Sequence, residues 1–362
     1  MAKLITYKKV LIAPLDWGLG HATRCIPLIN SLLQNGCEVI IASSGDQLAL
    51  LQKEFPRLQT IPLKGYNIQY SASKRSLPLK ILWQIPKILL SIRNEKRWLR
   101  QTIKDLEINL VISDNRFGLS SKLIPCVFIT HQLKIKAPYQ RLQNLIQKIN
   151  YRYINHYTEC WVPDFEGSFN VAGSLSHPSA MPVVPVKYIG PLCRFESTAE
   201  AEKKYSFLIL LSGPEPQRTL LENKILKLVP HLNGRLLFVR GKPGSYEEIE
   251  VPPNCTAINH LPTSQLQQAF AACEFIIGRS GYTTVMEVVS LQKKAILIPT
   301  PGQTEQEFLA RHLMQQNWCY SCSQDDDLLY HINKARDFAF SMPVLTKSSF
   351  KTVIEDFIAA HL

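Results

Sequence analysis

The sequence predicts an α/β protein made of two doubly wound domains with a cleft between them. Short apolar runs alternate with segments of helical spacing, and this alternation stops midway and then starts again. The chain has 362 residues, enough for two separate cores. Because strands alternate with helices, we expect a parallel sheet covered on both faces in each domain.

The first domain is expected to open with a strand over Lys9–Pro14, an apolar run that ends at a loop. Helical spacing follows over 21–34, and Asn35 with Gly36 provides a stop signal. The later elements of this half repeat the two patterns. Strands are predicted over 38–42, 109–113, 126–130 and 160–163, and helices near 79–106 and 138–154.

The second half repeats the alternation after a stretch rich in proline and small residues, 174–197, which we interpret as a linker. Five strands are predicted, over 206–211, 235–239, 256–258, 275–277 and 295–299. A last helix over about 346–360 is long enough to pack back on the first domain. We therefore place the domain boundaries at 1–190 and 191–345, with the C-terminal helix in 346–362.

Composition excludes several classes of protein. With 46% hydrophobic and 19% charged residues, the chain is neither disordered nor collagen-like. No apolar run reaches the roughly 18 residues of a membrane span, and none at the start suggests a signal peptide. We expect a cytoplasmic protein with peripheral contact at the inner face of the membrane. The nine cysteines lack zinc-site spacing, so we expect reduced thiols and no metal.

Positive charge is concentrated in the first half of the chain. Residues 1–190 hold 24 Lys and Arg against 11 Asp and Glu, whereas residues 191–362 hold 17 against 18. Nine of these bases and one acid, Glu95, lie within 74–104 among aliphatic residues and two tryptophans. Such a segment is typical of contact with anionic lipid. A solvated helix face is the alternative, and we expect no nucleic-acid partner because no binding module accompanies the bases.

The loop after the first strand, LDWGLGH, is the first candidate for a functional site. Gly18 and Gly20 allow the backbone to approach a ligand, and the next helix points its N-terminus there. The third glycine of the dinucleotide fingerprint is missing, which disfavours NAD. His21 would act as a base or bind a hydroxyl, unless it is a capping or packing histidine. Asp114, at a strand end, is either functional or part of an Asp-Asn turn.

The strongest signal is FIIGRSGYTTVME at 275–287, in the second half. A strand runs into Arg-Ser-Gly and a helix begins at once, which gathers amides, hydroxyls and a guanidinium where a diphosphate would bind. Glu287 follows about one and a half turns into the helix, where it would hold ribose hydroxyls. A capped helix with an incidental acid is the alternative. The residues assigned to the diphosphate are Arg279, Ser280, Gly281, Thr283 and Thr284.

Two further loops of the second half add candidates. Gln303 and Gln306 follow the strand over 295–299, and amides suit sugar hydroxyls because they both donate and accept hydrogen bonds. Ser212 and Gly213 form a small-residue loop that would contact phosphate. The acidic run 325–327 contains a DxD pattern but is more typical of a helix start.

With these motifs in place, the chain resembles glycosyltransferases of the GT-B fold, closest to family 28, which includes the peptidoglycan transferase that adds N-acetylglucosamine to lipid I. The resemblance rests on GLGHATR at 18–24 and on GRSGYTTVMEVV at 278–289 followed by PTPGQTEQE. It implies two Rossmann-like domains, an acceptor-binding one over 1–190 and a nucleotide-sugar-binding one over 191–345.

The resemblance also implies an inverting, metal-independent transfer from a UDP-sugar to a lipid-linked or cell-envelope glycan, with N-acetylglucosamine as the expected sugar and no cofactor. Arg194 would join Ser212 and residues 279–284 at the diphosphate. Glu287 would hold the ribose, and Gln303 and Gln306 would contact the donor sugar. His21 or Asp114 would take the acceptor's proton, while helix amides neutralise the leaving group.

Two other functions remain open. A UDP-N-acetylglucosamine 2-epimerase uses the same two-domain plan, but it needs no acceptor and leaves the basic first half unexplained. A nucleotide-sugar-binding subunit that works only with a partner chain is the non-enzyme alternative. The presence of His21, Asp114 and Glu287 argues against that second alternative.

Overall fold

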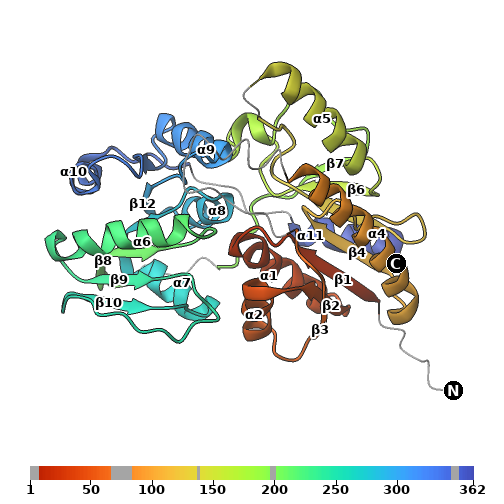
Figure 1. The fold of residues 1–362 in the computed structure, drawn as a ribbon, viewed down its shortest axis with the longest axis horizontal. Coiled ribbons are helices and arrows are strands. Elements are labelled where there is room, and N and C mark those ends of the chain that lie inside the picture. Colours follow the sequence, from red (N-terminus) through yellow and green to blue (C-terminus); the bar gives the residue numbers. More distant parts are fainter. Residues whose placement is uncertain (1–7, 67–83, 137–138, 196–200, 344–349) are drawn as a thin grey trace.

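The computed structural model describes residues 8–66, 84–136, 139–195, 201–343 and 350–362. These residues form two parallel β-sheets, each with helices on both faces (Figure 1). The predicted α/β architecture is confirmed. Within the described residues, no helix combines the length and the apolar character that a membrane crossing requires.

The first sheet has seven parallel strands in the order β3-β2-β1-β4-β5-β6-β7. Their central strands are continuous apolar runs because both faces of the sheet are covered. The strands are β1 (Lys9–Pro14), β2 (Glu38–Ser43), β3 (Gln59–Pro62), β4 (Leu110–Asp114), β5 (Cys126–Ile129), β6 (Glu159–Val162) and β7 (Val186–Tyr188).

Alternate side chains of β1 face different helices. The helices of this half are α1 (Leu19–Gln34), α2 (Gly45–Glu54), α4 (Ile85–Leu106) and α5 (Gln140–Ile154), joined by the last helix of the chain, α11 (Phe350–His361). Val10 and Ile12 are buried in one apolar cluster with α1 and α11, whereas Leu11 and Ala13 are buried in another with α4 and α5.

The second sheet has six parallel strands in the order β10-β9-β8-β11-β12-β13. The strands are β8 (Tyr205–Leu210), β9 (Leu236–Val239), β10 (Cys255–Ile258), β11 (Cys273–Gly278), β12 (Lys294–Leu297) and β13 (Tyr320–Ser321). The helices are α6 (Gln217–Leu228), α7 (Thr263–Ala272), α8 (Tyr282–Ser290), α9 (Thr304–Gln315) and α10 (Leu328–Lys334). Helices α7, α8 and α9 share one buried cluster with this sheet, and α6 and α10 share the other.

The predicted linker over 174–197 is wrong in part. Residues Val186–Tyr188 form β7, which pairs in parallel with β6 at the edge of the first sheet. The sequence signal for this strand is weak because it is three residues long and prolines flank it. Helix α2 and the short strands β3 and β13 were likewise not predicted.

The two halves of the molecule are in direct contact. Helix α1 touches both α8 and α11, and one buried apolar cluster contains residues of both sheets. Phe357 of α11 meets Trp161 of β6 edge to face, with ring centroids 5.4 Å apart. The last helix of the chain therefore packs on the first sheet, next to α1.

Candidate active site

Each sheet has a point where the strand order reverses, and the predicted loops lie at these two points. Strand β1 pairs with β2 on one side and β4 on the other, and β8 pairs in the same way with β9 and β11. Ligands of open α/β sheets bind outside the carboxyl ends of the strands at such a point. Gly18 follows β1 and Asp114 ends β4, whereas Ser212 follows β8 and Arg279 follows β11.

These two points face each other across the domain boundary. The Oγ1 atom of Thr283 donates a hydrogen bond to the carbonyl oxygen of Gly20 at 2.9 Å. A Cβ added to Gly20 would lie 3.0 Å from the same Oγ1 atom, so a glycine permits the close approach. The hydroxyl of Tyr282 donates to the carbonyl of Pro163 at 2.8 Å. The N-terminus of α8 is thus held against the start of α1, and Figure 1 shows the two helices as neighbours.

The loop before α1 is fixed by its backbone and by α2. Gly18 caps the helix with a φ of 84°, a left-handed conformation that favours glycine. The side-chain amide of Gln47 donates to the carbonyls of Leu15 and Gly18, at 2.5 and 2.6 Å. These bonds fix the loop that precedes His21.

His21 and Asp114 form a hydrogen-bonded pair. Nδ1 of His21 lies 3.0 Å from Oδ2 of Asp114, which is fully buried. Arg24 donates to both carboxylate oxygens, through Nε at 2.9 Å and through Nη2. Burial alone would raise the pKa of Asp114, but Arg24 and His21 outweigh it and lower this pKa to about 2. Asp114 is therefore ionised at neutral pH.

His21 is partly exposed, and its imidazole is kept neutral. Burial lowers its pKa below 6.5, and Arg24 and His131 act in the same direction against the opposing effect of Asp114. Among the described residues, no hydrogen bond involves Nε2 of His21. With Nδ1 on Asp114, Nε2 is the nitrogen that can accept a proton from a substrate.

Three residues of the site were not singled out from the sequence: Arg24, His131 and Glu305. Arg24 lies one turn after His21 within GLGHATR, and Glu305 lies within PTPGQTEQE. His131 lies two residues after the end of β5, which is the neighbour of the strand that ends in Asp114. The rule that ligands bind at strand ends could have pointed to His131, but the sequence gives no sign that the three meet.

Arg194 and Glu287 are paired with each other. Nε of Arg194 lies 2.8 Å from Oε1 of Glu287, and both side chains are buried. Burial raises the pKa of Glu287, an effect that Arg194 partly offsets. The predicted diphosphate and ribose contacts are thus side by side.

Arg279 is buried among backbone carbonyls. Its guanidinium donates to the carbonyls of Ile298 and Pro299 at 3.2 Å each, and to that of Gln217 at 2.7 Å. Burial lowers its pKa to about 10. In the part of the chain that the structure describes, its Nε atom has no hydrogen-bond partner.

The turn before α8 is tied to the start of α9. The hydroxyl of Ser280 donates to the carbonyl of Gln306 at 2.9 Å, and the side-chain oxygen of Gln306 accepts from the Thr300 amide at 2.8 Å. The side-chain oxygen of Gln303 is buried without a hydrogen-bond partner among the described residues. Gly281 caps α8, Thr284 is 9% exposed, and Ser212 and Gly213 are half-buried. The donor-binding roles of all these residues stay predictions.

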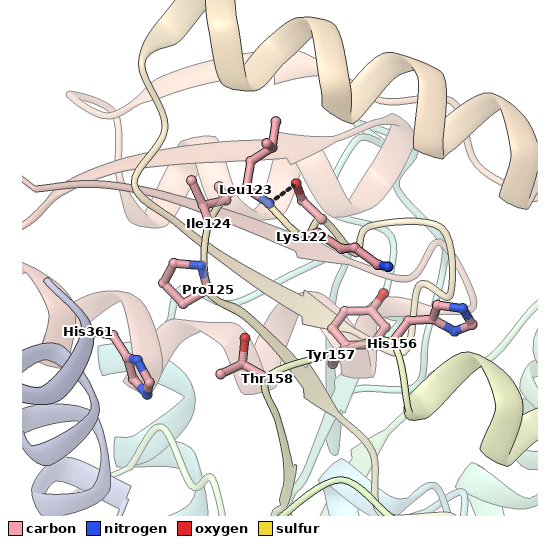
Figure 2. Close-up of a pocket in the computed structure, with 9 residues that line it drawn as sticks. Lys122, Leu123, Ile124, Pro125, His156, Tyr157, Thr158 and His361 are labelled. Atoms are coloured by element: carbon pink, nitrogen blue, oxygen red, sulfur yellow. Dashed lines mark hydrogen bonds between the residues drawn. The ribbon is translucent and has the colours of Figure 1, made fainter.

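Two other features lie outside this site. The carboxylate of Asp327 accepts from the Tyr330 amide at the start of α10, which accounts for the acidic run 325–327 as a helix start. A pocket lined by Pro125, His156 and His361 lies where β5 begins (Figure 2). It is therefore at the amino ends of the strands of the first sheet, whereas Asp114 is at the carboxyl end of β4. No group of three or more His, Cys, Asp or Glu residues is placed to hold a metal ion within the described ranges.

Comparison with known proteins finds glycosyltransferases, through a domain match in the second half and through relatives along most of the chain. Residues 220–343 match the glycosyltransferase family 28 C-terminal domain. The chain is 23% identical over 324 residues to an uncharacterized glycosyltransferase of Methanosarcina mazei, covering 83% of this chain and 81% of the relative. It is 25% identical over 313 residues to the UDP-N-acetylglucosamine–N-acetylmuramyl-(pentapeptide) pyrophosphoryl-undecaprenol N-acetylglucosamine transferase of Listeria monocytogenes, with coverages of 82% and 81%.

The fold comparison agrees with this result. The crystal structure of Acinetobacter baumannii MurG superposes with a TM-score of 0.57 at 15% identity, over 98% of this chain and 99% of that one. Both predictions, of the fold and of the enzyme class, are confirmed. Two facing strand-order reversals, a match to the family 28 C-terminal domain in the second half and glycosyltransferase relatives matched along most of their length lead to one conclusion: the chain is a glycosyltransferase of the GT-B fold.

Proposed function

We propose that the protein is an inverting, metal-independent glycosyltransferase that moves a sugar from a UDP-sugar to a lipid-linked or cell-envelope glycan. The observation that carries this proposal is the His21–Asp114 pair, held opposite the N-terminus of α8 by the contact between Gly20 and Thr283. N-acetylglucosamine is the expected sugar, since the Listeria monocytogenes relative is named as an N-acetylglucosamine transferase.

In the proposed step, the acceptor hydroxyl gives its proton to Nε2 of His21. Its oxygen forms a bond to the anomeric carbon of the donor sugar. The bond from that carbon to the phosphate oxygen breaks, and UDP leaves with the electron pair. Attack from the face opposite to UDP inverts the anomeric centre. Asp114 stabilises the imidazolium that forms, because its carboxylate stays ionised.

The N-terminus of α8 is the proposed site of the diphosphate. The first amides of a helix have no partner within the helix and attract an anion. Three buried side-chain atoms on the loops after β11 and β12 also lack partners among the described residues: Nε of Arg279, Oγ1 of Thr300 and Oε1 of Gln303. Buried polar atoms are normally hydrogen-bonded, so the lack of partners at these three atoms favours a polar ligand nearby. The Arg194–Glu287 pair would offer the ribose a carboxylate oxygen and guanidinium donors.

We also propose that α4 and α5 rest on an anionic membrane. Of the predicted segment 74–104, residues 74–83 lie outside the described residues. On α4, Leu89 and Leu90 are 39% and 57% exposed beside exposed bases, and on α5 Leu145 and Ile149 are 57% and 44% exposed. The ammonium of Lys96 lies 6.0 Å from the ring centre of Tyr153, so the two helices are neighbours. The exposed bases on the two helices are Lys87, Arg93, Arg97, Arg100, Lys104, Arg141, Lys148 and Arg152.

A thermal-shift screen tests the donor. Each candidate ligand is added in a separate sample: UDP, UDP-N-acetylglucosamine, UDP-glucose, UDP-galactose, GDP-mannose, dTDP-glucose and NAD. A ligand at one hundred times its Kd adds about 2.7 kcal/mol to the free energy of unfolding. We expect stabilisation by UDP and one UDP-sugar, followed by UDP release with glycan acceptors. A shift with NAD alone would overturn the proposal, and formation of UDP-N-acetylmannosamine from UDP-N-acetylglucosamine without any acceptor would identify an epimerase instead.

A further inference from the structure

A buried chain of polar contacts joins the two domains beside the proposed base. Nη1 of Arg24, on α1, lies 2.9 Å from Nδ1 of His131. Nε2 of His131 lies 2.8 Å from Oε1 of Glu305, which belongs to the first turn of α9 on the second domain. The His131 ring stacks on Tyr282 of α8, with centroids 4.1 Å apart and planes 3° from parallel. His131 is therefore held between the domains.

The chemistry of these groups fixes where the hydrogens lie. A guanidinium can only donate, so Nδ1 of His131 accepts from Arg24. The neutral ring then carries its hydrogen on Nε2 and donates it to Glu305. Burial would raise the pKa of Glu305, but His131, His21 and Arg24 outweigh it and lower that pKa. Glu305 is thus an ionised acceptor, and the two hydrogen bonds that link Arg24, His131 and Glu305 each have one possible direction.

The opposite edge of Arg24 faces the proposed catalytic pair. Nη2 of Arg24 lies 2.9 Å from Nδ1 of His21. Nδ1 of His21 in turn lies 3.0 Å from Oδ2 of Asp114. Nδ1 can serve only one of these partners. If it donates to Asp114, Nε2 is unprotonated and can act as a base. If it accepts from Arg24, the hydrogen lies on Nε2 and the base is lost. The position of the guanidinium decides between the two tautomers.

We propose that Glu305 is a positioning residue, which acts through His131 to hold Arg24 on Asp114 and so keeps His21 in the tautomer that can accept a proton. The inference rests on the proposed function, because it assumes that His21 is the base. Since Glu305 comes from α9, the base is competent only while the second domain is docked on the first. Docking of the two domains and proton removal are thereby coupled.

Histidine tautomers measured by NMR test the proposal without any substrate. In ¹⁵N-histidine-labelled protein, long-range ¹H–¹⁵N spectra distinguish Nδ1–H from Nε2–H. We expect Nδ1–H for His21 and Nε2–H for His131 in the wild type. Glu305→Ala should move His21 toward Nε2–H, whereas Glu305→Gln, which keeps an acceptor oxygen, should restore most of the wild-type signal. If Glu305→Ala does not fold, His131→Phe keeps the stacking on Tyr282 and removes the same bonds.

Kinetics provide the second readout. By analogy with residues that orient metal ligands through a hydrogen bond, Glu305→Ala should lower kcat by about ten- to a hundredfold and leave KM for the UDP-sugar within about twofold. Asp326→Asn is the matched control, because Asp326 faces Nε2 of His331 at 3.7 Å far from the site, and it should change neither readout. An unchanged His21 tautomer in Glu305→Ala would overturn the inference. Absence of UDP-sugar turnover in the wild type would instead overturn the proposed function, and the NMR result would still decide the contact chain.

Discussion

The guanidinium of Arg194 and the carboxylate of Glu287 meet at 2.8 Å in the interior of the second half, where both side chains are buried. Removing one partner of a buried ion pair leaves an uncompensated charge, while replacing both by apolar groups is often tolerated. The pair can therefore serve two purposes, structural and ligand-binding, and the two can be separated by experiment.

We expect Glu287→Ala to lower the free energy of unfolding by about 3–5 kcal/mol, because Arg194 is left buried without its partner. The double variant Arg194→Met with Glu287→Met should be closer to the wild type in a denaturant titration. If Glu287 holds the ribose, calorimetry should show at least about tenfold weaker UDP binding in both proteins. Wild-type UDP affinity in the double variant would remove both residues from the nucleotide site.

Replacement of His21 by alanine should separate chemistry from donor binding. Loss of a general base lowers kcat by about 10²–10⁴-fold. UDP affinity, measured by calorimetry, should stay within about twofold, since His21 lies on the domain opposite to the proposed nucleotide site. His156→Ala, at the pocket in Figure 2, is the control and should leave turnover unchanged. Wild-type turnover in His21→Ala would shift the role of base to another group.

The pH dependence of kcat/KM should report the lowered pKa of His21, because this profile reflects the ligand-free enzyme. A base works only when unprotonated, so activity falls as pH drops through its pKa. Because burial, Arg24 and His131 lower that pKa, we expect the acidic limb to inflect below pH 6.5. Asp114→Asn removes the group that opposes this lowering, so the inflection should move to still lower pH while kcat falls. An inflection above 6.5 in the wild type would contradict this assignment.

The membrane proposal is tested by neutralising bases on α4. Each base near an anionic surface contributes about 1 kcal/mol, so changing Lys87, Arg93 and Arg97 to Gln should lower the partition coefficient about a hundredfold. The measurement is co-sedimentation with phosphatidylglycerol vesicles, with phosphatidylcholine vesicles as the uncharged reference. A matched triple change on the second domain, at Lys203, Lys204 and Lys227, should have little effect. Equal binding by both triple variants would indicate that the bases of α4 are only solvated.

Local signals in the sequence predicted the central strands well, because the formation of these strands depends on runs of neighbouring apolar residues. Strand β1 begins and ends where its apolar run does, and the pairing of Pro14 with Asp114 brings His21 to the end of β4. The three-residue strand β7 lacks such a signal, since only its pairing with β6 makes it a strand.

Contacts between distant segments could not be predicted in the same way. Arg24 and His131 are 107 residues apart, and His131 and Glu305 are 174 apart. Their meeting depends on the order of strands in the first sheet and on how α9 docks against it. Likewise, the sequence suggested separate ligand contacts for Arg194 and Glu287, because burial of both side chains follows from packing rather than from local pattern.

The return of α11 to the first sheet has a mechanical consequence. The chain leaves that sheet after Tyr188, builds the second sheet from Tyr205 onward, and comes back to pack Phe357 on Trp161. Two covalent connections therefore join the halves. Any separation of the two halves must release Thr283 from Gly20.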